Sequence, residues 1–217
     1  MLKRFLTVFG LILLYMLALA SADLMIVLLA GKNDTLIRIM VVVTLVFSVA
    51  TMVPYMDWVA KKVFRFNGEG KPVSEAELRA QIQTINQFDV PVMIEERKGK
   101  LVATWKYVDA HWRELLSKAG LTKVYELHIK FDHAQHLVTL IDVTKSVSWG
   151  AGPTELRLRW SFFRGIMLTY EIGKQWGIKE SWKLGQVYDY KFRPKEVKMP
   201  IMNSILRSGW DVRFGIW

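Results

Sequence analysis

The chain contains no cysteine, which excludes disulfide bonds, thiolate metal sites and a cysteine nucleophile. It also lacks the short motifs that identify catalytic families: there is no Gly-x-Ser-x-Gly elbow, no phosphate-binding loop, no dinucleotide fingerprint and no His-Glu-x-x-His pattern. Internal repeats and low-complexity tracts are absent too. These absences favour a non-enzymatic protein without a cofactor.

The first part of the chain consists of two long apolar stretches. Leu2 to Gly31 and Leu36 to Val59 flank a short polar turn, and each is longer than the ~20 apolar residues that cross a bilayer core. We therefore predict a transmembrane helical hairpin over residues 1–60. Asp23 and Arg38 interrupt the two stretches. We expect Asp23 to reach the polar end near the turn or to contact a helical neighbour such as Arg38.

Basic residues gather at one end of the predicted hairpin. Lys3 and Arg4 precede the first stretch, and three more basic residues follow the second. Because the cytoplasmic flanks of membrane helices are rich in Lys and Arg, we predict a multi-pass protein of the inner (plasma) membrane with both termini in the cytoplasm. The residues expected at the inner membrane interface are Tyr55, Trp58, Lys61, Lys62 and Arg65.

The N-terminus also fits a cleaved secretory signal peptide. Lys3-Arg4, an apolar stretch and Ala20-Ser21-Ala22 match its three regions, and cleavage after Ala22 would make Asp23 the first residue of the mature chain. The apolar stretch continues from Leu24 to Ala30, which would be an unfavourable start for a soluble protein. We therefore favour the hairpin, and the mass of the mature chain separates the two interpretations.

The remainder of the chain is basic and long enough for one domain. The protein has 217 residues and a net charge of +10; residues 1–60 hold four basic and three acidic side chains, so 26 basic and 17 acidic residues remain, a charge of +9. A basic domain beside a cytoplasmic leaflet attracts anionic headgroups by about 1 kcal/mol per Lys or Arg near the surface. We expect a juxtamembrane linker over residues 61–73 and a cytoplasmic domain over 74–217.

Hydrophobic periodicity in this domain changes from helical to alternating near Val90. A helix is expected from residue 74 to 86, where Ser74 and Glu77 match the capping box. Strands are expected over 92–97, 101–107, 123–131, 136–144, 156–162, 166–172, 188–193 and 210–217, with short helices over 109–119 and 201–207. The predicted fold is α+β: a two-helix transmembrane hairpin, then a mainly antiparallel, strongly bent or barrel-like sheet with short helices.

The strand predicted at 156–162 carries a candidate anion-binding site. Arg157 and Arg159 alternate with apolar residues, so we expect them on one face roughly 7 Å apart, with Arg164 following at a predicted turn. Two guanidinium groups at this spacing can bind a phosphate or a carboxylate. The alternative is a surface whose charge is neutralised by acidic residues of neighbouring strands, and the sequence leaves both possibilities open.

Histidines form a second group of candidates. His128, His133 and His136 lie near Asp132 in the sequence, but their spacing matches no zinc pattern. We therefore expect surface histidines and no metal site.

Two other groups have ordinary explanations. In the helix expected over 109–119, one face carries Asp109, His111 and Glu114. These residues could form an acid–base pair, but we expect this face to be solvated. The C-terminal part interleaves Tyr190, Phe192 and Trp210 with basic residues, a composition that suits either single-stranded nucleic acid or a membrane interface. The predicted tether favours the membrane, so nucleic acid is not expected as a partner. The basic residues are Lys191, Arg193, Lys195, Lys198, Arg207 and Arg213.

The overall layout, two membrane helices followed by a strand-rich basic domain, resembles two broad groups of proteins. One group is small bacterial membrane proteins that carry a cytoplasmic pleckstrin-homology-like domain. The other is the two-helix, β-rich effectors of bacterial anti-phage signalling, which sense cyclic nucleotides. The resemblance lies in the order of the elements and assigns no site residue.

Two functional hypotheses follow. The first is a membrane-anchored, non-enzymatic protein whose basic domain binds a partner protein or anionic lipid within a homo-oligomer or a larger membrane complex. Small residues in the first helix would permit close packing of such helices: Gly10, Ala18, Ala20, Ser21 and Ala22. The second is an effector gated by a small anionic, nucleotide-like ligand near Arg157 and Arg159, for which a concave pocket lined by these arginines would be diagnostic.

Overall fold

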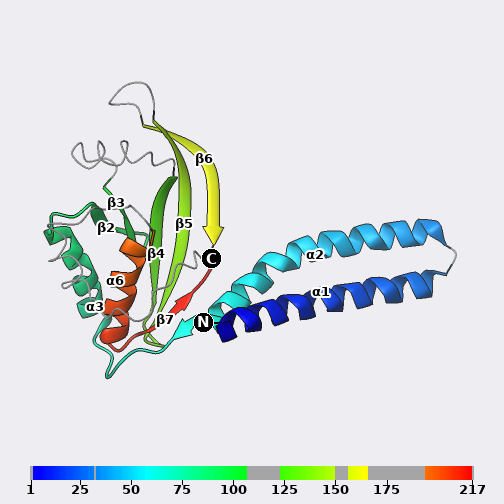
Figure 1. Cartoon of the computed structure of the whole chain (residues 1–217), viewed down its shortest axis with the longest axis horizontal. Helices are drawn as coiled ribbons and strands as arrows, with labels where there is room; N and C mark the ends of the chain where they lie inside the picture. Colours follow the sequence, from blue (N-terminus) through cyan, green and yellow to red (C-terminus); the bar gives the residue numbers. More distant parts are fainter. Residues whose placement is uncertain (1, 32, 107–122, 150–155, 166–193, 217) are drawn as a thin grey trace. The chain divides into compact units, whose positions relative to one another are not determined.

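The computed structural model describes residues 2–31, 33–106, 123–149, 156–165 and 194–216, and its elements are labelled in Figure 1. The chain divides into two compact units, Met1–Phe64 and Arg65–Trp217. The first unit is a hairpin of two long apolar helices and the second contains a mixed sheet with helices, so the α+β class is confirmed.

The hairpin consists of α1 (Leu2–Ala30) and α2 (Asp34–Val63), which lie side by side and run in opposite directions (Figure 1). At ~1.5 Å per residue, each helix is about 44 Å long, which matches a bilayer with its headgroups. Both are long and apolar enough to cross a membrane. Asn33 caps α2, since its side chain accepts a hydrogen bond from Leu36 N at 3.1 Å. The second helix continues past Pro54 and ends at Val63 instead of Val59.

One mixed sheet forms the framework of the second unit. In spatial order its strands are β1 (Arg65–Phe66), β7 (Asp211–Phe214), β5 (Leu137–Trp149), β4 (Lys123–Asp132), β3 (Lys100–Trp105) and β2 (Val92–Arg97). The start of β5 pairs with β7 in parallel, and its later part pairs antiparallel with β6 (Leu156–Gly165). All other pairs are antiparallel. The described strands do not close into a ring, so the barrel-like shape is not confirmed.

Helices cover one face of this sheet, which we call the helical face (Figure 1). α3 (Glu75–Gln83), the 3-10 turn η1 (Thr84–Gln87) and α6 (Pro194–Arg207) supply this layer. Ser74 caps α3 as predicted, because its hydroxyl accepts a hydrogen bond from Glu77 N at 3.2 Å. The core between helices and sheet is fully buried and includes Leu78, Ile82, Trp105, Leu127, Ile129, Ile201, Ile205 and Trp210.

A buried ion pair fixes α6 to the sheet. Lys198 Nζ donates to Asp142 Oδ2 at 2.6 Å, and the Tyr125 hydroxyl donates to Asp142 Oδ1 at 2.5 Å. The ammonium group also lies 3.8 Å from the ring centroid of Phe214. Burial lowers the pKa of Lys198, against the opposing charge of Asp142, while burial and Asp142 together raise the pKa of Tyr125. Lys198 therefore belongs to the core, and its placement in an exposed basic run was wrong.

Several predicted boundaries need correction, since β5 continues to Trp149 and β7 covers only Asp211–Phe214. The last helix begins at Pro194, not after Pro200; a proline suits the first helical turn because its missing N–H has no helical acceptor there. Strand β6 extends through the predicted turn at Arg164 to Gly165. The elements predicted at 109–119, 166–172 and 188–193 lie outside the described residues.

Candidate functional site

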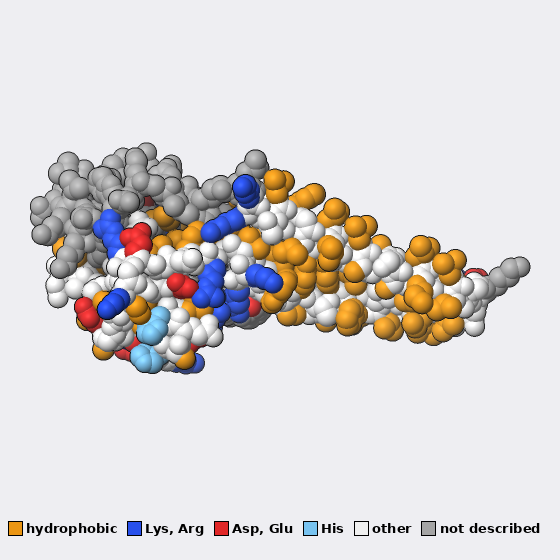
Figure 2. Space-filling model, turned by 90° about the horizontal axis from the view of Figure 1, so that it is seen from below, with side chains coloured by type: hydrophobic (Ala, Val, Ile, Leu, Met, Phe, Trp, Pro, Cys, Tyr) orange, Lys and Arg blue, Asp and Glu red, His pale blue; other side chains and the backbone are white. Residues whose placement is uncertain are grey.

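The outer surface of the hairpin is apolar along its length (Figure 2). Among the residues whose side chains are described, every exposed large apolar side chain lies between Phe5 and Trp58, and Leu29 reaches 78% exposure. Soluble monomers rarely expose apolar patches larger than a few hundred Å². The surface therefore indicates contact with lipid or with other apolar helices.

Two tyrosines of the hairpin, Tyr15 and Tyr55, lie at the contact between α1 and α2. The rings of Tyr15 and Tyr55 stack with centroids 4.6 Å apart. The Tyr15 hydroxyl donates to Ser48 O at 3.1 Å and lies 2.8 Å from Thr51 Oγ1, and the Tyr55 hydroxyl donates to Leu11 O at 2.7 Å. The hairpin thus satisfies these hydroxyl groups internally, as hydrocarbon surroundings require.

Of the predicted interface residues of α2, Tyr55 contacts α1, while Trp58, Lys61 and Lys62 contact residues of their own helix. The ring of Trp58 lies 6.0 Å from that of Tyr55, and Lys62 Nζ lies 4.9 Å from the Trp58 ring. Lys61 forms an ion pair with Asp57, one helical turn earlier. Tyr55 is therefore a helix-packing residue, while Trp58, Lys61 and Lys62 form a compact basic and aromatic end.

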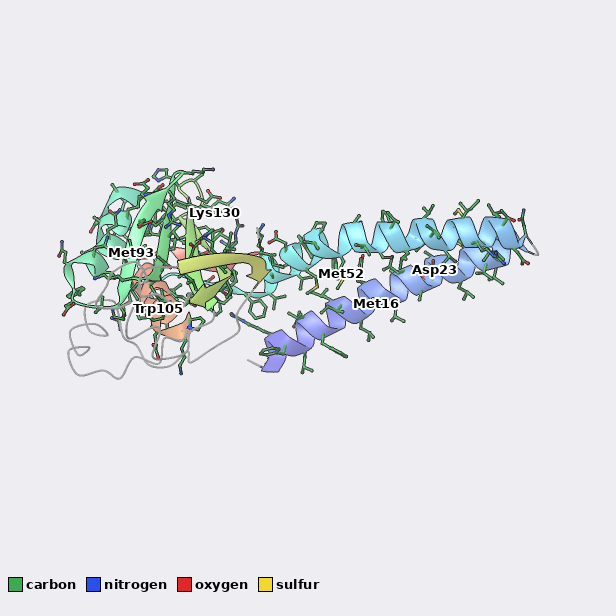
Figure 3. The ribbon with its side chains drawn as sticks, turned by 90° about the horizontal axis from the view of Figure 1, so that it is seen from above. Met16, Asp23, Met52, Met93, Trp105 and Lys130 are labelled. Atoms are coloured by element: carbon green, nitrogen blue, oxygen red, sulfur yellow. The ribbon has the colours of Figure 1, made fainter. Side chains whose placement is uncertain are left out.

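Asp23 is the polar exception within the hairpin. It lies on α1 in the region between the two helices (Figure 3). Its Oδ1 atom is buried and has no hydrogen-bond partner among the described residues, which also contain no ion pair between Asp23 and Arg38. The predicted contact with Arg38 is therefore not formed within the described part of the chain.

Several charged residues of the strands lie on the sheet face opposite the helices, which we call the charged face. Residues of β4 alternate as predicted: Tyr125 and Leu127 belong to the helical face, and Glu126, His128 and Lys130 belong to the charged face. Glu126 is 1% exposed and His128 is 7% exposed. The prediction that His128 is a surface histidine was therefore wrong.

Glu126 is the centre of a cluster of basic groups. Its Oε1 accepts from Lys145 Nζ at 2.5 Å and from Arg97 Nη1 at 3.4 Å. Its Oε2 lies 3.1 Å from His128 Nε2, and Lys100 Nζ lies 3.0 Å from His128 Nδ1. Because an ammonium group only donates, this arrangement makes Nδ1 the acceptor, and Nε2–H then donates a hydrogen bond to Glu126 Oε2. The imidazole therefore links Lys100 to the buried carboxylate.

This environment controls the ionisation of Glu126. Burial alone would raise the pKa of Glu126, but hydrogen bonds from His128 and Lys145 and the charge of Lys145 lower it from 4.5 to about 2. The carboxylate is therefore ionised at neutral pH. Two of the cations around it remain accessible, since the side chains of Lys145 and Arg97 are 30% and 39% exposed. Perturbed, buried charges of this kind are concentrated at functional sites.

Basic residues also form a transverse line across the charged face, which we call the basic row. Read from β2 to β1, the paired positions of the row are Arg97, Lys100, Lys130, Thr139, Arg213 and Arg65. The step from Lys100 to Lys130 continues the register that pairs Leu101 with Ile129. Lys130 is exposed and is labelled in Figure 3. Five of the six strands in this line thus contribute one basic residue each.

Carboxylates flank the basic row but do not interrupt it. Glu95 Oε2 accepts from Arg97 Nε at 2.8 Å. Asp211 accepts from Arg65 Nη2 at 2.7 Å and from Gly68 N at 3.0 Å, and these bonds lower the pKa of Asp211 against the effect of burial. The carboxylates of the two neighbouring rows are Glu95, Asp132 and Asp211, and Glu126 lies one row beyond Glu95. The row itself contains five cations and one threonine.

Strand β6 carries the three arginines of the predicted anion site, and their side chains are not among those described. The backbone register pairs Arg164 with Val143, which is itself paired with Glu126. Arg157 and Arg159 follow beyond a register shift in the β5–β6 pairing. The backbone thus brings Arg164 to the row of Glu126 and separates it from the other two arginines, and their joint role remains a prediction.

The remaining candidates show no shared site. His133 is exposed, with Nδ1 3.7 Å from Glu75 Oε2, and the ring of His136 lies 5.2 Å from that of Trp210. The described residues contain no group of three or more side chains suited to a metal. Trp210 is fully buried and therefore cannot stack with nucleic-acid bases. The predicted acid–base residues lie outside the described set: Asp109, His111 and Glu114.

Comparisons with known proteins give no match, whether to a family model, to a curated protein or to a solved structure. Three features of the molecule indicate its function: the apolar hairpin surface, the Glu126 cluster and the basic row.

Proposed function

We propose that the hairpin anchors this protein in a membrane and that its basic α+β domain binds an anionic partner at the cytoplasmic surface without catalysing a reaction. The polarity of the hairpin carries this proposal. Its large apolar side chains are exposed, while the hydroxyl groups of Tyr15 and Tyr55 bond between the helices. A hairpin with this distribution is suited to hydrocarbon and poorly suited to water.

The distribution of Lys and Arg at the ends of the two helices supports one orientation of the hairpin in the membrane. Lys3 and Arg4 begin α1, and Lys61 and Lys62 end α2; because the helices are antiparallel, these four residues lie at the same end of the hairpin. The turn end has fewer basic residues, among them Arg38 in the second turn of α2. The positive-inside rule then favours an inner-membrane protein with both termini in the cytoplasm.

Single-cysteine labelling tests both insertion and orientation, because the natural chain has no cysteine that would give background. Thr35→Cys places a thiol at the exposed turn end of the hairpin, and Ala134→Cys places one in an exposed turn of the domain. In sealed, right-side-out membrane vesicles, a membrane-impermeant maleimide should label Thr35→Cys. It should label Ala134→Cys only after detergent is added.

Other results would contradict the proposal in distinct ways. Labelling of Ala134→Cys in sealed vesicles would reverse the orientation. Release of the natural chain by alkaline carbonate would rule out a membrane-spanning hairpin. A mature chain that begins at Asp23, measured by mass spectrometry, would establish cleavage of a signal peptide instead.

Assembly through the hairpin is part of the same proposal. The exposed apolar surface can contact other helices as well as lipid, and α1 carries small residues that permit close approach: Gly10, Ala18, Ala20, Ser21 and Ala22. Native mass spectrometry of the protein extracted from its own membrane should show a fixed stoichiometry above one. A monomer under these conditions would exclude a stable homo-oligomer or complex.

The Glu126 cluster favours a second candidate function, an effector gated by a small anionic, nucleotide-like ligand. Arg97 and Lys145 are partly exposed cations held on a buried carboxylate, and the backbone of Arg164 lies in the same row. A phosphate that binds there would compete with Glu126 for these cations. A panel of cyclic and linear nucleotides should then raise the thermal midpoint of the natural protein but not of Arg97→Gln. No shift with any nucleotide would remove this candidate.

A further inference from the structure

We infer that the basic row of the charged face is a docking surface for the anionic phosphate headgroups of the membrane leaflet next to the domain. This inference rests on the membrane anchoring proposed above, and it names the residues that would make the contact. Those residues are Arg65, Arg97, Lys100, Lys130 and Arg213.

The row is extended rather than convergent. Neighbouring strands lie about 4.8 Å apart, so six strands place the row over roughly 24 Å. A site for one small anion gathers several donors on one point, as the Glu126 cluster does with Lys145 and His128. Cations spaced along a line instead fit a surface on which negative charges repeat. The leaflet of an anionic bilayer is such a surface.

The row costs the isolated domain stability. Arg65 is directly opposite Arg213, and Arg97 is directly opposite Lys100. Like charges at directly opposed positions of a sheet destabilise the pairing, by about 0.2 to 1 kcal/mol each. The flanking carboxylates lessen this cost: Asp211 accepts a hydrogen bond from Arg65, and Glu95 accepts one from Arg97. An anionic surface would offset the repulsion along the whole line.

Arg65, at one end of the row, is close in the sequence to the end of the hairpin. Arg65 is the second residue after Val63, where α2 ends, and two residues span at most about 7 Å. That distance is shorter than the Debye length of about 8 Å at physiological salt. Arg65 therefore stays within electrostatic reach of the headgroups that surround the basic end of α2. Strand pairing then places the other basic residues of the row in line with Arg65 across the sheet.

Lysine footprinting of the full chain tests the inference. The protein is reconstituted in nanodiscs made of phosphatidylcholine alone or with one-third phosphatidylglycerol, and acetylation rates are measured by peptide mass spectrometry. We expect Lys100 and Lys130 to react at least threefold more slowly in the anionic discs, and to recover at 0.5 M salt because screening weakens the contact. Lys71 and Lys195, which lie outside the row, are the internal controls.

Two results would overturn the inference. Equal rates in both kinds of disc would exclude lipid contact by the row. Protection in phosphatidylcholine discs by soluble inorganic triphosphate, without an effect of phosphatidylglycerol, would assign the row to a soluble ligand instead. Failure of the chain to remain in the discs would be a failure of the proposed anchoring, and is thus distinguishable from either result.

A charge-matched pair of variants separates the row from net charge. Lys130→Glu and Lys71→Glu change the charge of the chain equally, and both side chains are exposed. We expect Lys130→Glu to abolish the lipid protection of Lys100, and Lys71→Glu to leave it unchanged. Loss of protection in both variants would show that protection follows overall charge and would contradict a specific row. Circular dichroism of both variants verifies that they fold.

Discussion

The hairpin and the α+β domain place the same kinds of side chain in opposite positions. Leu29 of the hairpin is exposed, whereas Leu78 and Leu127 of the domain are fully buried. The hydroxyl groups of Tyr15 and Tyr55 lie between helices, whereas most charged groups of the domain lie on its outer surface. The hairpin and the domain thus distribute apolar and polar side chains in opposite ways, as the proposed anchoring of the hairpin in a membrane requires.

The domain also contains buried charges, and these have partners, whereas one buried carboxylate oxygen of the hairpin has none among the described residues. Asp142 receives hydrogen bonds from Lys198 and Tyr125, and Glu126 receives them from Lys145 and His128. In the hairpin, the buried Oδ1 of Asp23 has no partner within the described residues. A domain that folds in water can enclose a compensated ion pair, whereas two helices alone offer few donors to a carboxylate.

The largest effect is expected where a compensated charge of the domain loses its partner. Lys198→Met leaves the Asp142 carboxylate buried without its ammonium group. Removal of one partner from a buried ion pair costs about 3 to 5 kcal/mol. Urea unfolding of the full chain in detergent, followed by hydrogen exchange in β4 and β5, should show this loss in the domain and no change in the hairpin.

Two further variants sharpen that test. Lys195→Met changes the same helix outside the buried pair and should cost less than about 0.5 kcal/mol. Asp142→Leu combined with Lys198→Met replaces both charges by apolar groups and should recover much of the stability. A double variant no more stable than Lys198→Met would mean that the pair does more than compensate charge.

The next effect concerns the exterior of the hairpin. Leu17→Lys places a charge on an exposed site near the middle of α1, where insertion into a bilayer would cost about 3 kcal/mol or more. We expect a clear decrease in the carbonate-resistant fraction. Ala134→Lys, an equally charged change at an exposed turn of the domain, should have no effect. Unchanged extraction of Leu17→Lys would mean that this surface does not face lipid.

The sequence predicted helices and strands well where the local pattern of apolar and polar residues determines the element. Long apolar stretches identified α1 and α2, strict alternation in β4 identified its two faces, and the hydroxyl of Ser74 identified the start of α3. Each of these signals is local, since it depends on residues within two helical turns or one strand.

The pairing of distant residues could not be read in the same way. Lys198 looked like one of several surface lysines until α6 brought it to Asp142, which is 56 residues away. His128 looked solvated because its strand alternates, yet the charged face of the sheet is largely buried at that position. The basic row depends on the register of six strands, including a parallel pair, and no local pattern specifies that register.

A third prediction uses pH to probe the Glu126 cluster. The folded-state pKa of Glu126 is about 2, below its ordinary value of 4.5, so the charged carboxylate stabilises the fold above pH 4.5 and loses that effect as the pH falls toward 2. Glu126→Gln should therefore cost on the order of 3 kcal/mol at pH 7. The difference from the natural protein should shrink below pH 4.5. Glu96→Gln, at an exposed position, should cost little at either pH.

The smallest effect is expected inside the hairpin. Tyr55→Phe keeps the ring that stacks on Tyr15 but removes the hydroxyl that donates to Leu11 O. Hydrogen bonds between membrane helices are worth about 0.6 to 2 kcal/mol, because the separated helices find other partners in the bilayer. Helix separation in mixed micelles with increasing SDS, followed by energy transfer between labels at the two helix ends, measures this loss. Phe9→Leu, on the exposed side of α1, should leave the SDS midpoint unchanged. If Phe9→Leu lowered the midpoint more than Tyr55→Phe, then apolar contact and not the polar interior would hold the helices together, and the contrast between hairpin and domain would lose its basis.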